Sequence, residues 1–429
     1  MENTHNFLLP KTNLMGMGAI KDLPNELLPW KLTKALIVTD KNIISLGWVE
    51  QVEKILKNLF IFYDIFDGVM HPNPTVSFVE DGLSYFSSRL NIFSRQYKLI
   101  ISVGGGSNHD CAKAIAAVAT NGGSIIDYEG YLKMTKPAIP LIAINTTAGS
   151  AAEITMTAII NDESRKVKMT ITSPFITPFI SVNDPLFMTT MPQEVTASSG
   201  IDVVSHSVEA YMSIESSPVT DSLALTAIRL VFGYLRRAYE NGNDLKAREQ
   251  MMYANAMAGM AFNSAGLGYV HGMSHQLGGF YGGFHGYYNG VLLPYVFQFN
   301  ASAVPAGKIL NLAEAIGVTA SSKLEAVEKI FIAIKNLTAA IGIPAGLDKL
   351  GVDENDIDVL AENALKDICS LTNPRKGSQQ DVVNLYKAAM WAKPGIITEA
   401  YDNATPGMLM PLSIAENANL SYGTSTQIH

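Results

Sequence analysis

The chain has 429 residues, of which 48% are hydrophobic and only 16% are charged, and its net charge is −8. This composition predicts a folded globular protein with large cores and excludes a disordered one. The acidic balance, without a long basic run, argues against nucleic acid as a partner. The sequence has no run of about 18 apolar residues, so we expect no membrane-spanning helix.

Two cysteines, Cys111 and Cys369, are too few for a disulfide framework and are typical of a reducing compartment. The N-terminal residues lack a basic segment followed by an apolar one, so we expect no signal peptide and a cytoplasmic location. The low charge and high apolar content also hint at buried subunit interfaces.

Strand-like and helix-like segments alternate in the first part of the chain. We expect strands within residues 34–40, 59–66, 97–107 and 139–149, and a helix from Asp110 to about Thr120. Such alternation predicts an α/β domain with a parallel sheet covered by helices.

From about Met191 the strand signals nearly vanish. Long amphipathic segments follow, at residues 217–240, 244–265, 304–316 and 322–341. We therefore predict an α/β domain over residues 1–189, an all-helical domain over 190–390 and a C-terminal extension over 391–429. A cleft between the two domains is the expected place for an active site.

A glycine-rich turn, GGGSNHDCAK (104–113), follows a buried strand and opens a helix. Glycines allow backbone N–H groups to approach phosphate oxygens, and a helix N-terminus favours negative charge. The pattern is not the G-x-G-x-x-G fingerprint, so an ordinary turn between a strand and a helix is an open alternative.

Two further positions are candidates for nucleotide contacts. Asp40 ends the strand at 34–40, where an acid commonly accepts hydrogen bonds from ribose hydroxyls and favours NAD over NADP. The alternative role for Asp40 is that of a helix N-cap. Thr146 and Thr147 follow another buried strand, and their hydroxyls suit a pyrophosphate or a ribose.

Five residues form a candidate metal site. Asp202 and His206, and likewise His271 and His275, are four residues apart and share a helix face, and His285 follows closely. One carboxylate and three imidazoles suit Fe(II) or Zn(II), which act on a substrate oxygen as Lewis acids. Spacing alone does not choose among the histidines, and histidines that only form hydrogen bonds are the alternative. Eight glycines within residues 266–286 favour a close backbone approach.

Together these segments resemble the iron-containing (group III) alcohol dehydrogenase family. Within it the chain is most similar to the NAD-dependent methanol, 1,3-propanediol and lactaldehyde (1,2-propanediol) dehydrogenases. The resemblance runs from about Phe7 to about Met390, in order and in spacing. It rests on HPNP (71–74), GGGSNHDCAKAIA (104–116), INTTAGSAAEIT (144–155), NDP (183–185), GIDVVSHSVEAYMS (200–213), AREQM (247–251), AGMAFNSAGLGYVHGMSHQLGGFYGGFHG (258–286), LLPYV (292–296) and LTNPR (371–375).

The resemblance implies a Rossmann-like domain, a helical domain and a metal in the cleft between them. It implies hydride transfer between a short-chain primary alcohol or diol and NAD, in a dimer or larger ring. It places Fe2+, or else Zn2+, Mg2+ or Mn2+, on Asp202, His206, His271 and His285. His275 becomes a catalytic residue that contacts substrate or relays protons. The implied dinucleotide contacts are Asp40, Asn73, Gly105, Gly106, Ser107, Asp110, Thr146, Thr147 and Lys168, although Lys168 without the resemblance reads as a surface lysine.

The chain departs from the family pattern in three places. TTAGSAAE stands for the more usual TTAGTGSE, Ser199-Gly200 stands for Thr-Gly, and Gly282 and Gly283 occupy positions where larger residues are common. The glycines reshape the expected substrate pocket.

Two other functions are compatible with parts of the pattern. A dehydroquinate synthase-like lyase shares the fold, NAD and the metal, but needs several basic residues in its cleft. The motif segments hold few, mainly Lys113 and Lys168. A scaffold or metal-storage protein would not need both the polar turns that suit a nucleotide and the residues that suit a metal.

Overall fold

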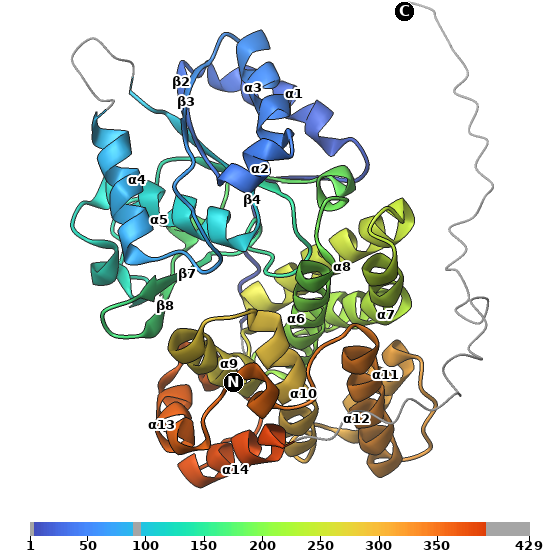
Figure 1. Ribbon diagram of the computed structural model, residues 1–429. Coiled ribbons are helices and arrows are strands. Elements are labelled where there is room, and N and C mark those ends of the chain that lie inside the picture. Colours follow the sequence, from blue (N-terminus) through green and yellow to red (C-terminus); the bar gives the residue numbers. More distant parts are fainter. Residues whose placement is uncertain (1–3, 89–95, 392–429) are drawn as a thin grey trace, which may run out of the picture. The chain divides into compact units, whose positions relative to one another are not determined.

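The computed structural model describes residues 4–88 and 96–391. A six-stranded sheet forms its first half, with the strand order β1-β9-β6-β4-β2-β3 and every neighbouring pair parallel. The predicted parallel sheet is therefore confirmed (Figure 1). The strands are β1 (Thr12–Met15), β2 (Lys34–Val38), β3 (Phe62–Phe66), β4 (Leu99–Gly104), β6 (Leu141–Asn145) and β9 (Ile180–Asn183).

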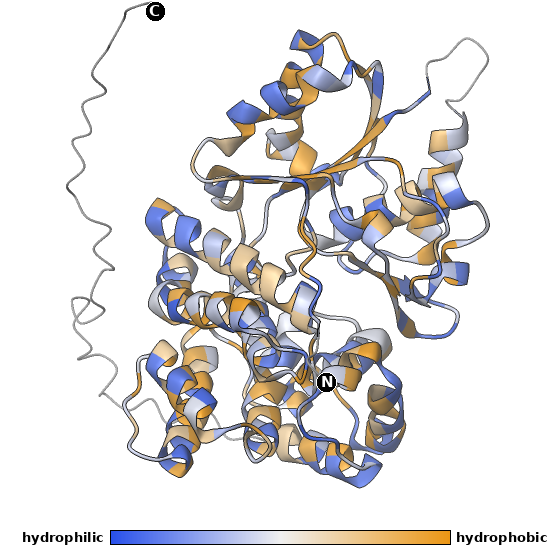
Figure 2. Cartoon of the chain, turned by 180° about the vertical axis from the view of Figure 1, so that it is seen from behind, coloured by the Kyte–Doolittle hydropathy of each residue, from blue (hydrophilic) through white to orange (hydrophobic). Residues whose placement is uncertain are grey.

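Helices cover both faces of this sheet, because neighbouring residues of a strand point to opposite sides. Leu36 and Ile100 pack in one apolar cluster with residues of α4 and α5, whereas Ile37 and Ile101 pack in another with residues of α3. Burial on both sides explains why β4 and β6 are mostly apolar, as the orange strands of the sheet in Figure 2 show. The helices of this half are α1 (Leu23–Leu27), α2 (Lys41–Ser45), α3 (Trp48–Asn58), α4 (Val76–Ser88) and α5 (Gly106–Asn121).

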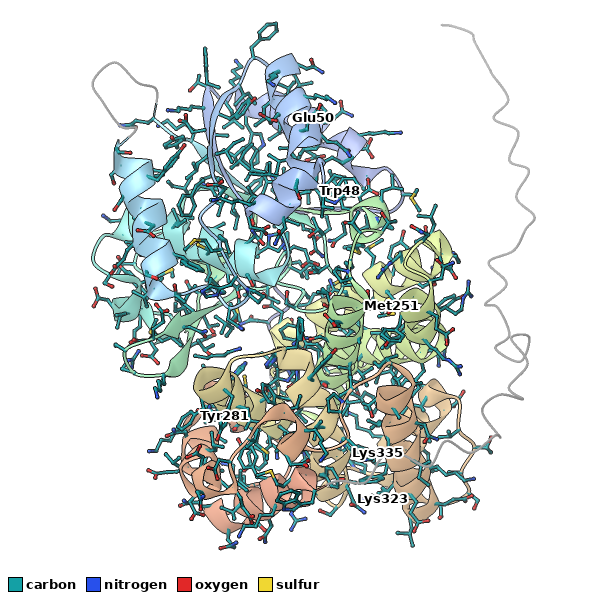
Figure 3. The ribbon with its side chains drawn as sticks, in the orientation of Figure 1. Trp48, Glu50, Met251, Tyr281, Lys323 and Lys335 are labelled. Carbon is teal, nitrogen blue, oxygen red and sulfur yellow. The ribbon has the colours of Figure 1, made fainter. Side chains whose placement is uncertain are left out.

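Trp48 joins this half of the chain to the segment that leads into the second half. It begins α3, as labelled in Figure 3, and stacks on Phe187 with ring centroids 4.6 Å apart. Phe187 belongs to the short 3-10 turn Pro185–Met188, which follows β9 directly. Aromatic stacking thus holds the chain where it leaves the sheet.

A second, three-stranded sheet was not predicted. Its order is β5 (Gly130–Tyr131), β8 (Val167–Thr172), β7 (Thr157–Asp162), and β7 and β8 are antiparallel. The strands β1 and β9 were not predicted either. Strands of four residues carry little periodicity of their own, and pairing with distant partners defines them.

From α6 onward the described elements are helical, as predicted. The four amphipathic segments correspond to α7, α8, α11 and α12, with ends within two residues of those expected. The helices are α6 (Gln193–Met212), α7 (Pro218–Glu240), α8 (Leu245–Ala265), α9 (Tyr269–Tyr281), α10 (His285–Ala301), α11 (Ala306–Ile316), α12 (Lys323–Ala340), α13 (Ile357–Lys366) and α14 (Gln379–Met390).

One helix begins at a different residue from the one expected. The helix expected from Asp110 begins one turn earlier, at Gly106, because the glycine turn itself supplies its first residues. The domain division at 189/190 stays a prediction, and the expected extension at 391–429 lies, after Trp391, outside the described residues. Among the helices of residues 4–88 and 96–391, none is long and apolar enough to cross a membrane.

Candidate active site

Three helices carry the predicted metal ligands. Asp202 and His206 lie on α6, His271 and His275 lie on α9, and His285 is the first residue of α10. The prediction that each pair with a spacing of four shares one helix is confirmed. Packing of α6 against α8 and α10, and of α10 against α9, brings these segments together although they are up to 83 residues apart in sequence.

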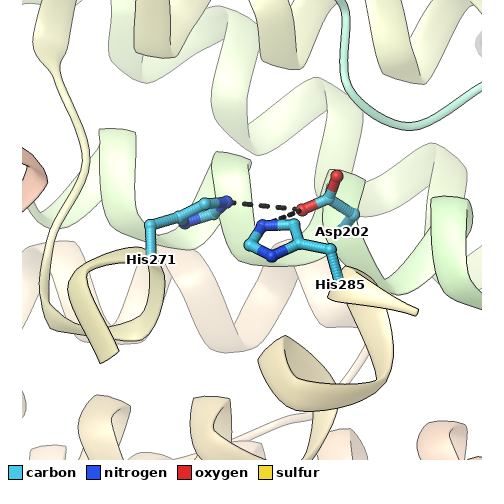
Figure 4. A group of neighbouring side chains, drawn as sticks. All are labelled: Asp202, His271 and His285. Atoms are coloured by element: carbon cyan, nitrogen blue, oxygen red, sulfur yellow. Dashed lines mark hydrogen bonds and ion pairs between the residues drawn. The ribbon is translucent and has the colours of Figure 1, made fainter. Parts of the chain in front are cut away.

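One oxygen of Asp202 is the common neighbour of three imidazoles. Its Oδ1 lies 3.3 Å from His271 Nε2, 3.7 Å from His206 Nε2 and 3.9 Å from His285 Nε2. Figure 4 shows His271 and His285 turned toward this carboxylate. Three imidazole nitrogens gathered around one carboxylate oxygen form a donor set that fits Fe(II) or Zn(II).

The charges of these groups also fit a divalent cation. Burial lowers the pKa of His206 to about 3 and that of His285 well below its usual value, so both are neutral near pH 7. Burial would raise the pKa of Asp202, but His206 and the other imidazoles outweigh it and hold the carboxyl ionised. Burial alone would lower the pKa of His271, but Glu209, together with Asp202, outweighs burial and raises this pKa to about 9. Metal binding there requires loss of that proton.

His275 lies beside this group rather than within it. Its ring centroid is 5.4 Å from that of His285 and 6.0 Å from that of His271. Its Nδ1 lies 2.9 Å from Asp367 Oδ2, which fixes the ring orientation. His275 thus differs from the other three histidines in its acidic partner, which is Asp367 and not Asp202, and spacing alone did not show this.

Three polar partners of the site were not predicted from the sequence. Glu209 Oε2 lies 2.5 Å from His271 Nδ1, Asn289 Nδ2 donates to Asp202 Oδ1 at 2.7 Å, and Asp367 pairs with His275. Glu209 follows His206 by three residues and Asn289 follows His285 by four, so helix spacing could have found both. Asp367 is 92 residues from His275, and no local signal points to it.

The two polar turns predicted to bind a nucleotide lie side by side. They follow β4 and β6, which are neighbours in the parallel sheet, and Thr146 N donates to Gly104 O at 3.0 Å. A Cβ on Gly105 would lie 2.9 Å from Thr147 Cγ2, so the turn admits no side chain there. Gly105 caps α5 without a side-chain hydrogen bond, which leaves backbone N–H groups of the first turn for an anion.

Asp40 lies at the end of β2, beside the glycine turn. Its Oδ1 accepts hydrogen bonds from the backbone N–H groups of Asn42 and Ile43, at 2.8 and 3.0 Å. Its Oδ2 accepts from Asn108 Nδ2 at 3.1 Å. The N-cap alternative is confirmed, and the ribose contact stays a prediction.

Lys168 on β8 is buried, with 8% of its surface exposed, so the surface-lysine alternative is wrong. Its Nζ donates to Asn73 Oδ1 at 2.8 Å, and Asn73 N donates to Ser107 Oγ at 3.2 Å. Burial lowers the pKa of Lys168 to about 8. These contacts join the HPNP loop, the glycine turn and β8.

Asp110 has its contacts in the interior. Its Oδ2 accepts from Ile159 N at 3.1 Å, and its Oδ1 lies 3.8 Å from Lys113 Nζ. Burial raises the pKa of Asp110 to about 6. The carboxyl group therefore holds α5 against β7.

The nucleotide turns and the histidine helices belong to one region. A Cβ on Gly278 of α9 would lie 2.7 Å from Lys168 Nζ, and a Cβ on Gly149 would lie 2.8 Å from Ser199 Cα of α6. Glycines at both places allow the close approach. The metal-type donors therefore lie next to the polar turns.

Two changes from the usual family pattern lie at left-handed backbone positions. Ala151, where the family pattern has glycine, has φ +51°, and Gly282 and Gly283, just before His285, have φ +70° and +76°. The two glycines suit this conformation, whereas Ala151 holds it at a cost in strain.

Comparison with known proteins gives a consistent set of matches. Residues 10–185 match the family model for iron-containing alcohol dehydrogenase, and residues 196–390 match the model for the C-terminal part of that family. The chain is 44% identical over 389 residues to 1,3-propanediol dehydrogenase of Klebsiella pneumoniae, covering 89% of this chain and 98% of that one. It is 40% identical over 387 residues to NAD-dependent methanol dehydrogenase of Bacillus methanolicus, covering 90% and 100%. A crystal structure of 1,3-propanediol oxidoreductase superimposes with a TM-score of 0.86 at 43% identity, covering 90% and 100%.

Proposed function

The chain belongs to the iron-containing alcohol dehydrogenase family, and on this premise we propose that it interconverts short-chain primary alcohols or diols and their aldehydes with NAD(H). The observation that carries the proposal is the convergence of three imidazole nitrogens on Asp202 Oδ1. Adjacent polar turns on the parallel sheet, suited to a dinucleotide, complete the requirements of such a reaction. Diol and methanol relatives favour small substrates.

Asp202, His206, His271 and His285 are the proposed ligands of Fe2+, with Zn2+, Mg2+ or Mn2+ as alternatives. When bound, such a cation polarises the alcohol or carbonyl oxygen and makes the alcohol more acidic. The side chain of His285 is the most exposed of the four, at 23%, compared with 10% for Asp202. This exposure favours substrate entry on the α10 side.

His275 is the proposed proton carrier. Asp367 holds its Nδ1, so its Nε2 is the atom available to a substrate hydroxyl or to water. The Asp367 carboxylate would stabilise a positive charge on the ring while the proton is held there. Asp40, Asn73, Gly105, Gly106, Ser107, Asp110, Thr146, Thr147 and Lys168 are the proposed dinucleotide residues.

The lyase alternative is not favoured by the lysines of the motif segments. Lys113 is fully buried and donates to Thr155 Oγ1 and Thr157 O, at 3.2 and 2.6 Å. Lys168 is engaged by Asn73. Lys113 is therefore not free to neutralise a phosphorylated, carboxylated substrate, and Lys168 lies among the residues proposed for the dinucleotide.

A cytoplasmic homo-oligomer is the proposed setting. Cys111 and Cys369 are both free thiols, which suits a reducing compartment. Light scattering of the purified protein tests the assembly, and a monomer at all concentrations would contradict it.

The function is tested by following NADH absorbance with purified, Fe2+-reconstituted protein. A panel of short alcohols, diols and aldehydes is offered with and without a chelator. We expect turnover that the chelator abolishes and that His271→Ala lacks. Full turnover by metal-free protein would refute the metal-dependent mechanism, and turnover confined to a phosphorylated acid would favour the lyase.

A further inference from the structure

The three imidazoles around Asp202 differ in what holds their second nitrogen. His271 Nδ1 faces Glu209 Oε2 at 2.5 Å. Within residues 4–88 and 96–391, the Nδ1 atoms of His206 and His285 form no such pair with a carboxylate and have no hydrogen-bond partner. His271 is therefore the one ligand of this group whose ring is fixed by an acid.

We propose that Glu209 is a positioning residue of the metal centre, acting through His271; this rests on the metal site of the proposed function. A carboxylate acceptor at Nδ1 selects the tautomer that carries its proton there. Nε2 then faces Asp202 Oδ1, 3.3 Å away, and donates its lone pair to a cation bound between them once the Nε2 proton is lost. Glu209 thus fixes the orientation of the His271 ring, so that loss of the Nε2 proton to a cation leaves a ligand already turned toward the other donors.

The local structure holds Glu209 in this position. It lies on α6, seven residues after Asp202 and three after His206, so one rigid helix supplies two ligands and the acid. Its other oxygen, Oε1, accepts from Val270 N in the first turn of α9 at 2.6 Å. Gly268 makes room for it, because a Cβ there would lie 2.8 Å from Glu209 Oε1.

Charge gives a second reason for this role. Glu209 is 4% exposed, and Asp202 is 7% exposed. Two buried carboxylates beside neutral imidazoles match the charge of one divalent cation, whereas Asp202 alone would leave an excess positive charge in the interior. Glu209 therefore adds to the affinity for the cation without being a ligand.

Glu209→Gln separates this role from a merely structural one. A glutamine oxygen still accepts the Val270 N–H, so α9 keeps its first turn. Its amide donates to His271 Nδ1 instead of accepting, which selects the opposite tautomer and turns an N–H toward Asp202. We expect Zn2+ affinity to fall about 10- to 100-fold with little change in stability.

The measurement is Zn2+ affinity of the full chain by competition with a chromophoric chelator, supported by the visible absorption of Co2+-loaded protein. Glu194→Gln, an exposed residue at the start of the same helix, is the control for the loss of one charge. Glu209→Asp, which keeps the carboxylate, is expected to retain more affinity than Glu209→Gln.

A double variant tests whether the effect passes through His271. In the His271→Ala background, Glu209→Gln is expected to lower Zn2+ affinity much less than in the wild type, because only the contribution of its charge remains. A tenfold further loss there, or wild-type affinity in Glu209→Gln alone, would overturn the positioning role and leave the proposed function intact. Wild-type protein that binds neither Zn2+ nor Co2+ would overturn the proposed function and this inference with it.

Discussion

Asp202 on α6 and Asn289 on α10 are joined by a hydrogen bond of 2.7 Å from Asn289 Nδ2 to Asp202 Oδ1. The same amide nitrogen lies 3.2 Å from His285 Nε2 and 3.3 Å from His271 Nε2. Asn289 is fully buried, and these three contacts place its amide nitrogen among the proposed ligands. It therefore orients Asp202 relative to the histidines of two other helices.

Asn289→Ala removes this donor and leaves Asp202 free to turn. We expect metal affinity about 10-fold lower, since loss of an outer partner commonly costs this much. The check is the Zn2+ dissociation constant by chelator competition. Asn243→Ala, at an exposed position, is the control. Unchanged affinity in Asn289→Ala would show that Asp202 is fixed by other contacts.

His271 and His275 lie one helix turn apart, and we expect their replacement to affect metal binding and turnover differently. His271→Ala should lose bound metal and turnover together, because it removes a proposed ligand. His275→Ala should keep metal and NAD affinity and lose about 100-fold or more in kcat, since it removes a proton carrier. Metal analysis together with steady-state kinetics separates the two, and a metal-free His275→Ala protein would make His275 a ligand.

Gly259 on α8 has no room for a side chain. A Cβ there would lie 2.4 Å from Ala151 Cβ, so Gly259→Ala should lower the unfolding free energy by about 1–3 kcal/mol. Adding Ala151→Gly removes the clash and the strain at φ +51°, and should restore most of the stability.

Denaturant unfolding of the single and double variants checks this. Gly307→Ala on α11 is the matched control, because a Cβ at that position meets nothing within 4 Å and alanine favours a helix. A double variant as unstable as Gly259→Ala would mean that Ala151 is not the obstacle.

His109 makes stability depend on pH. It is fully buried, and burial, with Lys113 contributing, lowers its pKa to about 3 from about 6.5 in the unfolded chain. The unfolded state thus binds the proton first, so the stability contribution is present at neutral pH and is lost as the pH falls below about 6.5. From about pH 7.5 to about pH 5 the loss is about 2 kcal/mol.

His109→Asn keeps a hydrogen-bonding group next to Ser102 Oγ, which lies 2.8 Å from His109 Nδ1, but it cannot titrate. Chelator-treated wild type should lose about 2 kcal/mol more than His109→Asn over this pH range in denaturant unfolding. The exposed His5→Asn variant is the control and should follow the wild type. Parallel pH profiles for wild type and His109→Asn would contradict the buried neutral state.

Local patterns in the sequence were sufficient for much of the fold. Short, mostly apolar runs that alternate with helical segments predicted four strands of the parallel sheet, because strands covered on both faces are predominantly apolar. Amphipathic periodicity predicted α7, α8, α11 and α12. The short strands β1 and β9 were missed because pairing over long sequence distances defines them. The local hairpin of β7 and β8 was missed as well.

The sequence by itself determined which chemical groups share a helix face, and so predicted a site of carboxylate and imidazole donors. Only the tertiary structure decided how those groups are used. It turned His275 toward Asp367, supplied Glu209 to His271 and buried Lys168 against Asn73. Spacing within a helix fixes the direction of a side chain, whereas the group that it meets depends on how separate helices and strands pack.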